Sequence, residues 1–333
     1  MGRQAFLCVV REDLYYSYIE NNMEKGVLGI YGIPLPEKRR RYSAISDALS
    51  VKEGDIIFFY VREEKIIKGP FLTASPVFYS TDPNSYDITF PLRFLVKPSR
   101  EVGSIEYYEF LWSIDRGDLW SVRNPAAEAR GTRKSMYKMT VEEAEVLNKM
   151  LDKKKQLNKD YKSPNIRREF SVEELFLREK PQSITEEYIQ AWLIYYLSKR
   201  DQLVVQIFGE YKDYLFEVPL FASSPTTQMD VLSILNDKEI KIVELKRDVI
   251  YSRGMLTKKG IEALDELNKY IFYLSKKLES KGYRVIGGYI LGKVHGDVYA
   301  SSIKNHTRYH VDIISYTYAS NENRVSFNLM KPR

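Results

Sequence analysis

The amino-acid sequence predicts a two-domain α/β protein, and three observations lead to this prediction. The chain has 333 residues, about twice the usual length of one domain. Strand-like segments dominate residues 1–151, whereas residues 169–333 read as helix, strand, hairpin, helix and strand. A basic segment, residues 152–168, separates the two regions. We therefore expect a small barrel-like β domain closed by a helix, a linker, and an α/β core with a mixed central sheet.

Composition excludes several classes of protein. Hydrophobic residues make up 44% and charged residues 29% of the chain, as in globular domains. The sequence has neither an apolar run of the roughly 18 residues that span a bilayer nor the apolar core of a signal peptide. Cys8 is the only cysteine, so disulfide frameworks and cysteine-based zinc sites are excluded. We expect a cytoplasmic protein without a membrane partner.

The net charge of +6 is concentrated in one segment. Residues 152–168 contain seven lysines and arginines against two aspartates, so their charge is +5 and the other 316 residues carry +1. Such a run is typical of a surface that contacts nucleic acid, although a solvated loop without a ligand has the same composition. If the segment contacts nucleic acid, Lys153 and Lys154 are the expected phosphate contacts.

The first region contains short apolar and aromatic runs that are typical of strands. Strands are expected at residues 5–10, 56–61, 66–74, 86–96 and 105–112. Thr140 and Glu143 have the spacing of a capping box, which predicts a helix over residues 141–151. Together these elements predict the barrel-like domain and the helix that closes it.

Three motifs in this region resemble a known superfamily. Residues 54–60 (GDIIFFY), a polar turn and residues 67–69 (IKG) resemble the core of PUA-like domains. Residues 91–94 (PLRF) and the run at 130–140 resemble the EVE and YTH-type branches, although Phe6 stands where EVE domains often have tryptophan. The resemblance covers roughly residues 3–150. It implies a PUA-like β-barrel with helices that holds a flipped or single-stranded modified base in an aromatic pocket.

Aromatic residues beside a carboxylate are the candidates for that pocket. A base that leaves its stack recovers stacking energy between aromatic rings. Trp112 and Trp120 flank a polar stretch with Asp115, whose carboxylate can accept a hydrogen bond from an exocyclic amine. Tyr31 is a weaker candidate of the same kind. The alternative is that both tryptophans belong to the core of the barrel.

The second region places charged residues at one end of an apolar hairpin. A turn at residues 236–239 joins two strand-like runs, with Asp230 near the start of the first. Glu244 and Lys246 alternate along the second strand and therefore share a face. Buried charges are costly unless they are paired or bind a metal. We expect Asp230, Glu244 and the Leu245 carbonyl to bind Mg²⁺, with Mn²⁺ able to substitute, and Lys246 to position the attacking water.

This arrangement resembles the PD-(D/E)XK nucleases. The hairpin is part of an α-β-β-β-α-β order. The other elements are helices expected from residue 186 and at residues 258–278, and strands expected at residues 203–208 and 283–291. Residues 243–247 and 263–270 resemble the archaeal and actinobacterial mismatch-cutting endonucleases more closely, over about residues 183–292. The alternative is a surface ion pair on an edge strand.

The resemblance also assigns residues around this pattern. It implies a restriction-endonuclease-like core in which Glu186, or otherwise Glu187, adds to the metal shell through water. Arg247 and Tyr270 are expected to contact DNA. Glu266 occupies the position of a glutamine in the family, so a carboxylate replaces an amide at this contact.

Together the two regions predict a Mg²⁺-dependent DNA endonuclease with an N-terminal base reader. Modified, mismatched or partly single-stranded DNA is the expected partner, in modification-dependent restriction or in DNA repair. A double-strand break needs two active sites, which favours a homodimer. The alternative is a non-catalytic nucleic-acid-binding protein, with RNA as its partner, in which the nuclease fold is inactive.

Overall fold

The computed structural model describes residues 3–37, 40–126, 134–156, 160–219 and 232–333. The described chain divides into two compact units, and the division falls between Arg178 and Glu179. Each unit combines helices with one sheet, which confirms the expected mixed α/β class. The basic segment at 152–168 lies within the first unit, so the division comes later in the chain than the expected linker. Among the described helices, none combines the length and apolar character needed to cross a bilayer.

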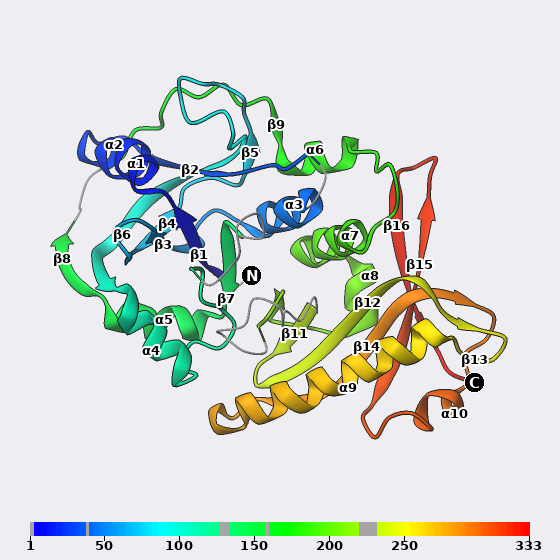
Figure 1. Cartoon of the computed structure of the whole chain (residues 1–333). Helices are drawn as coiled ribbons and strands as arrows, with labels where there is room; N and C mark the ends of the chain where they lie inside the picture. The colour runs from blue at the N-terminus through cyan, green and yellow to red at the C-terminus, as the bar shows by residue number, and fades with distance from the viewer. Residues whose placement is uncertain (1–2, 38–39, 127–133, 157–159, 220–231) are drawn as a thin grey trace. The chain divides into compact units, whose positions relative to one another are not determined.

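The sheet of unit 1 curls into a half-barrel (Figure 1). Its described strands are β1 (Ala5–Val10), β2 (Gly29–Ile33), β3 (Ile56–Val61), β4 (Ile66–Thr73), β5 (Phe78–Tyr79), β6 (Leu92–Glu106), β7 (Met136–Met139), β8 (Asp152–Gln156) and β9 (Phe170–Ser171). They follow the order β7-β1-β3-β4-β6-β5-β9, and β2 and β8 also pair with β6. β1 and β3 are parallel, while the other pairs are antiparallel.

The helices of unit 1 are short. They are α1 (Glu12–Leu14), the π-helix η1 (Tyr15–Glu20), α2 (Asn21–Glu24), α3 (Arg41–Ser50), α4 (Tyr107–Asp115), α5 (Val141–Met150) and α6 (Val172–Arg178). The capping box of Thr140 and Glu143 is present at the start of α5, as predicted. The strand expected at 105–112 is wrong beyond Glu106, because Phe110 and Ile114 are buried at helical spacing on α4. The expected strand at 86–96 begins only at Leu92.

Strands β1, β3 and β4 and helices α4 and α5 enclose one apolar core in unit 1. The core includes Leu7, Phe58, Ile67, Phe110 and Leu147, all of them buried. Residues on β3 are apolar almost without interruption, because both faces of this strand are covered. The half-barrel is therefore a packed unit, and a ligand site has to lie beside this core.

Unit 2 contains the mixed sheet that the sequence predicts. Its described strands are β10 (Asp213–Phe216), β11 (Leu232–Asn236), β12 (Glu239–Ser252), β13 (Met255–Leu256), β14 (Arg284–His295), β15 (Val311–Ala319) and β16 (Arg324–Met330). The order is β10-β11-β12-β14-β15-β16, and β13 pairs with β12. β12, β14 and β15 are parallel neighbours, whereas the outer pairs are antiparallel. The hairpin is confirmed, because Asn236 pairs with Glu239 at its turn.

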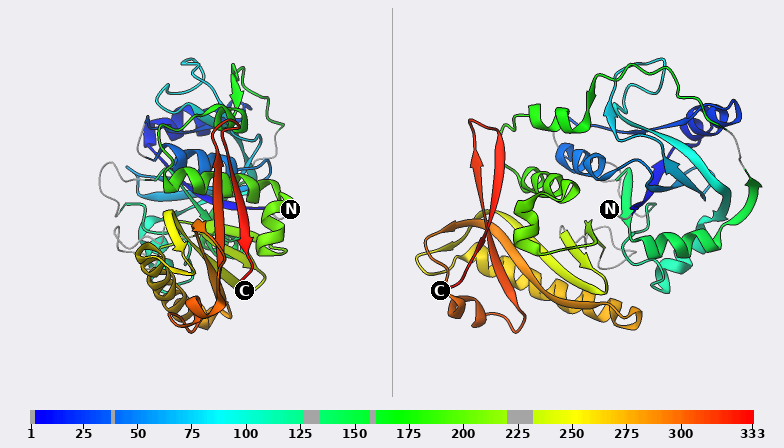
Figure 2. Two further views of the ribbon diagram at one scale, coloured as in Figure 1. Left: turned by 90° about the vertical axis from the view of Figure 1, so that its right-hand side faces the viewer. Right: turned by 180° about the vertical axis from the view of Figure 1, so that it is seen from behind.

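The long helix α9 (Lys258–Leu278) joins β12 to β14 and runs along both strands (Figure 1). Figure 2 shows this packing from two further directions. Ala263, Leu267, Ile271 and Leu274 are buried at helical spacing and form the apolar stripe that faces the sheet. A Cβ atom on Gly260 would lie 2.0 Å from the Ile250 carbonyl oxygen, so only glycine allows this approach. The helix backbone is thereby held against β12.

The helices α7 (Glu186–Lys199) and α8 (Gln202–Phe208) precede the sheet. The strand expected at 203–208 is wrong. Asp201 caps α8 by accepting a hydrogen bond from the Leu203 amide at 2.9 Å, and Val204 and Ile207 are buried on one helical face. The first strand of the unit is β10 instead. The short helices η2 (Glu279–Lys281) and α10 (Ala300–Lys304) complete the described elements of unit 2.

Candidate functional sites

Strand β12 and helix α9 bring one lysine and two glutamates together in unit 2. Glu244 and Lys246 share a face of β12, and Glu266 reaches them from α9. The Lys246 ammonium nitrogen lies 2.7 Å from Glu244 Oε1 and 2.6 Å from Glu266 Oε2. Leu245 alternates with them along the strand and is buried at 8% exposure. We call Glu244, Lys246 and Glu266 the lysine cluster.

Burial determines the protonation of the lysine cluster. Glu244 is only 4% exposed, and burial raises its pKa to about 8 although Lys246 acts in the opposite direction. Burial lowers the pKa of Lys246, but the two carboxylates outweigh this effect and the net change is upward. Burial also raises the pKa of Glu266, but hydrogen bonds with Lys246 and Glu244 give a net decrease. Burial therefore favours the protonated form of Glu244, whereas the contacts of Lys246 and Glu266 favour their charged forms.

Glu186, at the start of α7, contacts β12 at the residue after Lys246. Thr185 caps this helix by accepting a hydrogen bond from the Tyr188 amide at 3.2 Å. In this position Glu186 Oε1 accepts a hydrogen bond of 3.2 Å from the backbone amide of Arg247, the residue after Lys246. Glu187 is exposed. Of the two acidic residues that the sequence offers, the structure brings Glu186 to β12.

Tyr316 on β15 is a neighbour that the sequence analysis missed. Its hydroxyl donates a hydrogen bond to the Arg247 carbonyl oxygen. Burial raises the pKa of Tyr316 to about 12, and the carboxylates of Asp248 and Glu186 add to the increase. The chain has 26 tyrosines and Tyr316 lies far along it from β12, so no local signal identifies this residue.

Three predicted residues lie in part or entirely outside the described structure. Asp230 precedes the described start of β11 at Leu232, which pairs with Val243. Lys153 and Lys154 belong to β8, but their side chains are outside the description. Among the described residues, no group of three or more histidines, cysteines, aspartates and glutamates is arranged to hold a metal.

Unit 1 contains a cavity of about 120 Å³, several times the ~10–15 Å³ that one water needs. Three aromatic residues, Tyr31, Tyr86 and Phe90, contribute to its lining. Tyr31 is buried, and its hydroxyl donates a hydrogen bond of 2.7 Å to the Ser135 carbonyl oxygen. A Cβ atom on Gly32 would lie 2.5 Å from the Tyr86 ring, so glycine allows the ring to approach β2. We call this space the aromatic cavity.

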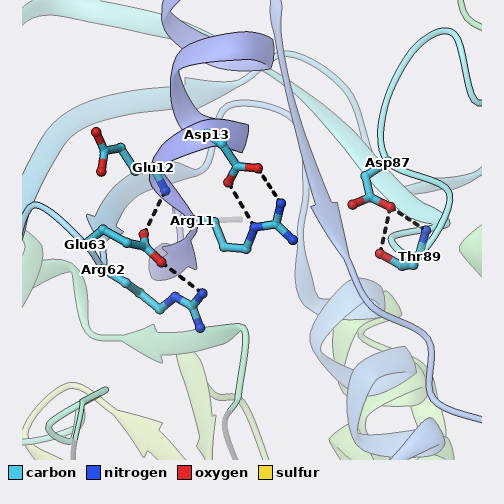
Figure 3. A network of polar contacts seen from close by, with 7 residues as sticks. All are labelled: Arg11, Glu12, Asp13, Arg62, Glu63, Asp87 and Thr89. Atoms are coloured by element: carbon cyan, nitrogen blue, oxygen red, sulfur yellow. Dashed lines mark hydrogen bonds and ion pairs between the residues drawn. The ribbon is translucent and has the colours of Figure 1, made fainter.

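Cations surround the aromatic cavity, and carboxylates hold them in place. Arg11 donates a hydrogen bond of 2.9 Å from Nε to Asp13, and Arg62 lies 3.2 Å from Glu63 (Figure 3). Glu63 also accepts a hydrogen bond of 2.8 Å from the Glu12 amide. Nearby, the Thr89 amide and hydroxyl donate to the Asp87 carboxylate and fix the loop before Phe90 (Figure 3).

A third cation, Lys134, also lines the cavity and lies deeper. Its ammonium nitrogen is 2.9 Å from Asp47 Oδ1, and the two side chains are 6% and 4% exposed. The cavity thus combines planar apolar walls with positive charge, although sequence reasoning selected only Tyr31 among its lining residues. The lining residues come from segments that are distant in the sequence and meet only in the folded chain.

The two tryptophans expected to form a base cage have different environments. Trp112 on α4 is 62% exposed and packs edge-to-face with Tyr108, whereas Trp120 is only 2% exposed. The Trp120 amide donates a hydrogen bond to Glu143, the glutamate of the α5 capping box. Asp115 is exposed at the end of α4. A cage needs two accessible indole faces, and the structure provides one.

Tyr270 and Glu266 are one turn apart on α9, so the helix places both on neighbouring parts of its surface. Tyr270 is half-buried, and Glu266 belongs to the lysine cluster. The glutamate that replaces a family amide therefore contacts the cluster lysine directly. Sequence reasoning selected the residue, but the contact with Lys246 is a result of the structure.

Comparisons with known proteins add little to this geometry. No protein-family model matches the chain, and no curated protein matches it. Among solved structures, the chain is similar to Rpa0253 from Rhodopseudomonas palustris, an NMR structure from a structural genomics consortium. The two share 18% sequence identity over 44% of this chain and 92% of that one, with a TM-score of 0.30. A similarity this weak supports no inference about fold or function.

Proposed function

We propose that the protein is a Mg²⁺-dependent DNA endonuclease. In this proposal unit 2 is a restriction-endonuclease-like core of the PD-(D/E)XK type, and unit 1 is a PUA-like base reader. The main support is the lysine cluster. It joins the two charged residues of the Glu244-Leu245-Lys246 motif to a third charged residue, Glu266 of α9. The β10-β11-β12-α9-β14 order agrees with that of the nuclease core.

The charges of the lysine cluster suit a divalent cation. With all groups ionised, one ammonium group faces two carboxylates, so the cluster has one negative charge in excess. Buried carboxylates are costly without a compensating charge, and burial raises the pKa of Glu244 to about 8. Carboxylate and carbonyl oxygens are the donors that Mg²⁺ prefers. We infer that Glu244 and the Leu245 carbonyl would hold Mg²⁺, or Mn²⁺ in its place, together with Asp230 by the sequence motif.

The protein's own side chains have separate roles in the proposed hydrolysis. Bound Mg²⁺ would act as a Lewis acid and promote ionisation of water. Lys246, held between two carboxylates, would donate a hydrogen bond to the attacking water and offset negative charge on the phosphate. Glu266 would position the Lys246 ammonium group. Glu186 fixes the backbone at Arg247, whose side chain would contact a neighbouring phosphate.

The aromatic cavity supports base recognition by unit 1. Phe90 is partly exposed and can stack on a flipped base, Tyr31 and Tyr86 form the buried wall behind it, and Arg11 and Arg62 can contact the phosphates beside it. This cavity replaces the tryptophan pair as the proposed base site. A base-recognition domain joined to a nuclease domain fits modification-dependent restriction better than general repair. In restriction, recognition of the modified base by unit 1 would directly select the DNA that is cleaved. Double-strand cleavage would require a homodimer.

A cleavage panel tests the enzymatic proposal. Purified full-length protein is incubated with modified, mismatched, partly single-stranded and plain DNA, in Mg²⁺, in Mn²⁺ or in EDTA. We expect cleavage of at least one substrate with Mg²⁺ and none with EDTA. If no substrate is cut with either metal, the enzymatic proposal fails. Tight RNA binding by the same inactive protein would then support the non-catalytic alternative.

Substitutions on one loop test the base reader. Phe90→Ala removes a ring that lines the aromatic cavity, whereas Ile88→Ala changes an exposed residue that does not line it. We expect Phe90→Ala to weaken binding of the preferred modified DNA by roughly five-fold or more, since stacking contributes about 1–3 kcal/mol per base. Binding of plain DNA should change little. Equal effects of the two substitutions would contradict the assignment of the cavity.

A further inference from the structure

Unit 2 has an open groove, separate from the lysine cluster, with a volume of about 630 Å³. It lies between the middle of α9 and the loop that follows α10. Its lining contains three cations, three aromatic residues and no carboxylate. The lining residues are Asn268, Lys269, Phe272, Tyr273, Lys304, Asn305, His306, Thr307, Arg308 and Tyr309. We call it the α9 groove.

Hydrogen bonds between its two walls hold the α9 groove in shape. The Asn268 side-chain amide donates a hydrogen bond of 3.3 Å to the His306 carbonyl oxygen. The Thr307 hydroxyl donates one of 2.6 Å to the Asn268 side-chain oxygen. The loop is thereby attached to α9 through both the NH2 group and the oxygen of the Asn268 side chain. A ligand would enter a preformed groove and would not have to order the loop.

No carboxylate is among the described residues that line the α9 groove beside its cations. Within the described part of the chain, none of Lys269, Lys304 and Arg308 forms an ion pair with a carboxylate. Arg308 instead lies over the Tyr309 ring, with its guanidinium carbon 5.2 Å from the ring centroid. A concave surface lined by charge of one sign concentrates ligands of the opposite sign. The α9 groove therefore favours a ligand with several negative charges.

The groove also exposes aromatic rings beside these cations. Phe272 is 43% and Tyr273 is 44% exposed, and both belong to the helix wall. Exposed aromatic faces next to a cationic track are what proteins use to bind unpaired nucleotides, because every base has a face that can stack. In a duplex the bases are stacked on one another inside the helix, so they are not available to stack on these rings.

The α9 groove begins next to the lysine cluster. Lys269 is three residues after Glu266 on α9, so the two side chains are neighbours on the helix surface. A strand in the groove would therefore continue toward the residues proposed to cut it.

We propose that the α9 groove binds a single DNA strand next to the cleavage site. Lys269, Lys304 and Arg308 contact phosphates, while Phe272 and Tyr273 stack on bases. The role of guiding a strand to the lysine cluster rests on the proposed nuclease function. Binding itself does not, since it needs neither metal nor hydrolysis.

Fluorescence anisotropy of a labelled 15-nucleotide oligo(dT) tests this binding in EDTA with the full-length protein. The groove variant carries Lys269→Gln, Lys304→Gln and Arg308→Gln. Losing three phosphate contacts should reduce the slope of log affinity against log salt by about 2 and weaken binding roughly ten-fold or more near 0.1 M salt. Phe272→Ala with Tyr273→Ala should weaken binding about five-fold or more without changing that slope.

A matched control removes three cations of unit 2 that do not line the groove. Lys212→Gln, Lys238→Gln and Arg284→Gln give the same change in net charge, and two of these residues form exposed ion pairs at the hairpin end of the sheet. We expect this variant to keep the wild-type salt slope. Equal losses in the control and groove variants would contradict the proposal, because the effect would then depend on net charge alone.

Two further outcomes separate this proposal from its alternatives. If the groove variant loses affinity for a labelled duplex as much as for oligo(dT), the groove binds duplex DNA and the single-strand assignment is wrong. If the wild type cuts no DNA but the groove variant still loses oligo(dT) binding, the groove assignment holds and only the nuclease proposal fails. Unchanged oligo(dT) binding in a folded groove variant would overturn the assignment whether or not the protein cuts DNA.

Discussion

Each unit contains a lysine in contact with a buried carboxylate, and the two sites differ in their exposure to solvent. In unit 1, Lys134 Nζ lies 2.9 Å from Asp47 Oδ1, and the two side chains are 6% and 4% exposed. In unit 2, Lys246 lies between Glu244 and Glu266, and the Glu266 side chain is 41% exposed. A contact between opposite charges that is almost completely buried suits a structural role. A lysine between a buried and a solvent-exposed carboxylate suits a site that handles a cation or a phosphate.

The largest expected effect on stability comes from breaking the contact in unit 1. Lys134→Met leaves the buried Asp47 carboxylate without its lysine, which should reduce the free energy of unfolding by about 3–5 kcal/mol. Arg116→Met is the control, because it removes the cation of an exposed pair with Asp118 and should cost under ~1 kcal/mol. Urea unfolding measures both. Similar losses for the two variants would contradict a structural role for Lys134.

A second buried carboxylate of unit 1 predicts how stability depends on pH. Asp55 is 3% exposed and accepts hydrogen bonds from the Gln4 and Lys52 amides, yet burial raises its pKa from 3.8 to about 6. The folded state therefore binds this proton more tightly than the unfolded state. The resulting stabilisation, roughly 3 kcal/mol, is complete below pH ~4 and is lost as the pH rises through ~6.

Comparison with Asp55→Asn isolates this contribution, because asparagine does not titrate. The free energy of unfolding of the wild type minus that of the variant should fall by roughly 2.5 kcal/mol between pH 4 and pH 7. The measurement is urea unfolding at several pH values. A difference that stays constant or rises over this range would show that burial does not dominate at Asp55.

The smallest expected change in stability is for Glu244→Gln in unit 2. The raised pKa of about 8 keeps Glu244 largely protonated at pH 7 without metal, and glutamine preserves its shape. We expect a change within about 1 kcal/mol, whereas Asp47→Asn in unit 1 should cost more because it removes the charge that faces Lys134. Mg²⁺ should raise the melting temperature of the wild type but not of Glu244→Gln. An equal loss of stability in Glu244→Gln and Asp47→Asn would contradict the proposed difference between the two sites.

The sequence predicts those parts of unit 2 that depend on regular spacing. The periodic apolar residues of α9 define that helix within its observed bounds, and the turn at 236–239 fixes the hairpin. The resemblance to the nuclease family favours Glu186 over Glu187, and the structure brings Glu186 to β12. The predictions of the helix and the hairpin succeed because a long repeat gives many residues that agree with one another.

Short apolar runs and long-range contacts could not be predicted in this way. The apolar run at residues 203–208 is too short for its periodicity to distinguish a strand from a helix. The structure forms a helix there, and Asp201 caps its N-terminus. The contact of Glu266 with Lys246 depends on how α9 packs against β12, which Gly260 permits by its close approach to the strand. Similarly, the aromatic cavity joins residues that are more than fifty positions apart, such as Tyr31 and Tyr86.

The most direct test of the lysine cluster compares two lysines on the same strand. Lys246 lies between two carboxylates, whereas Lys241 contacts the Tyr289 hydroxyl at 3.2 Å. The rate of Mg²⁺-dependent DNA cleavage is measured for the wild type, Lys246→Met and Lys241→Met. A catalytic cluster predicts a loss of roughly 10²–10³-fold or more for Lys246→Met and less than about three-fold for Lys241→Met. Cleavage by folded Lys246→Met at the wild-type rate would contradict it.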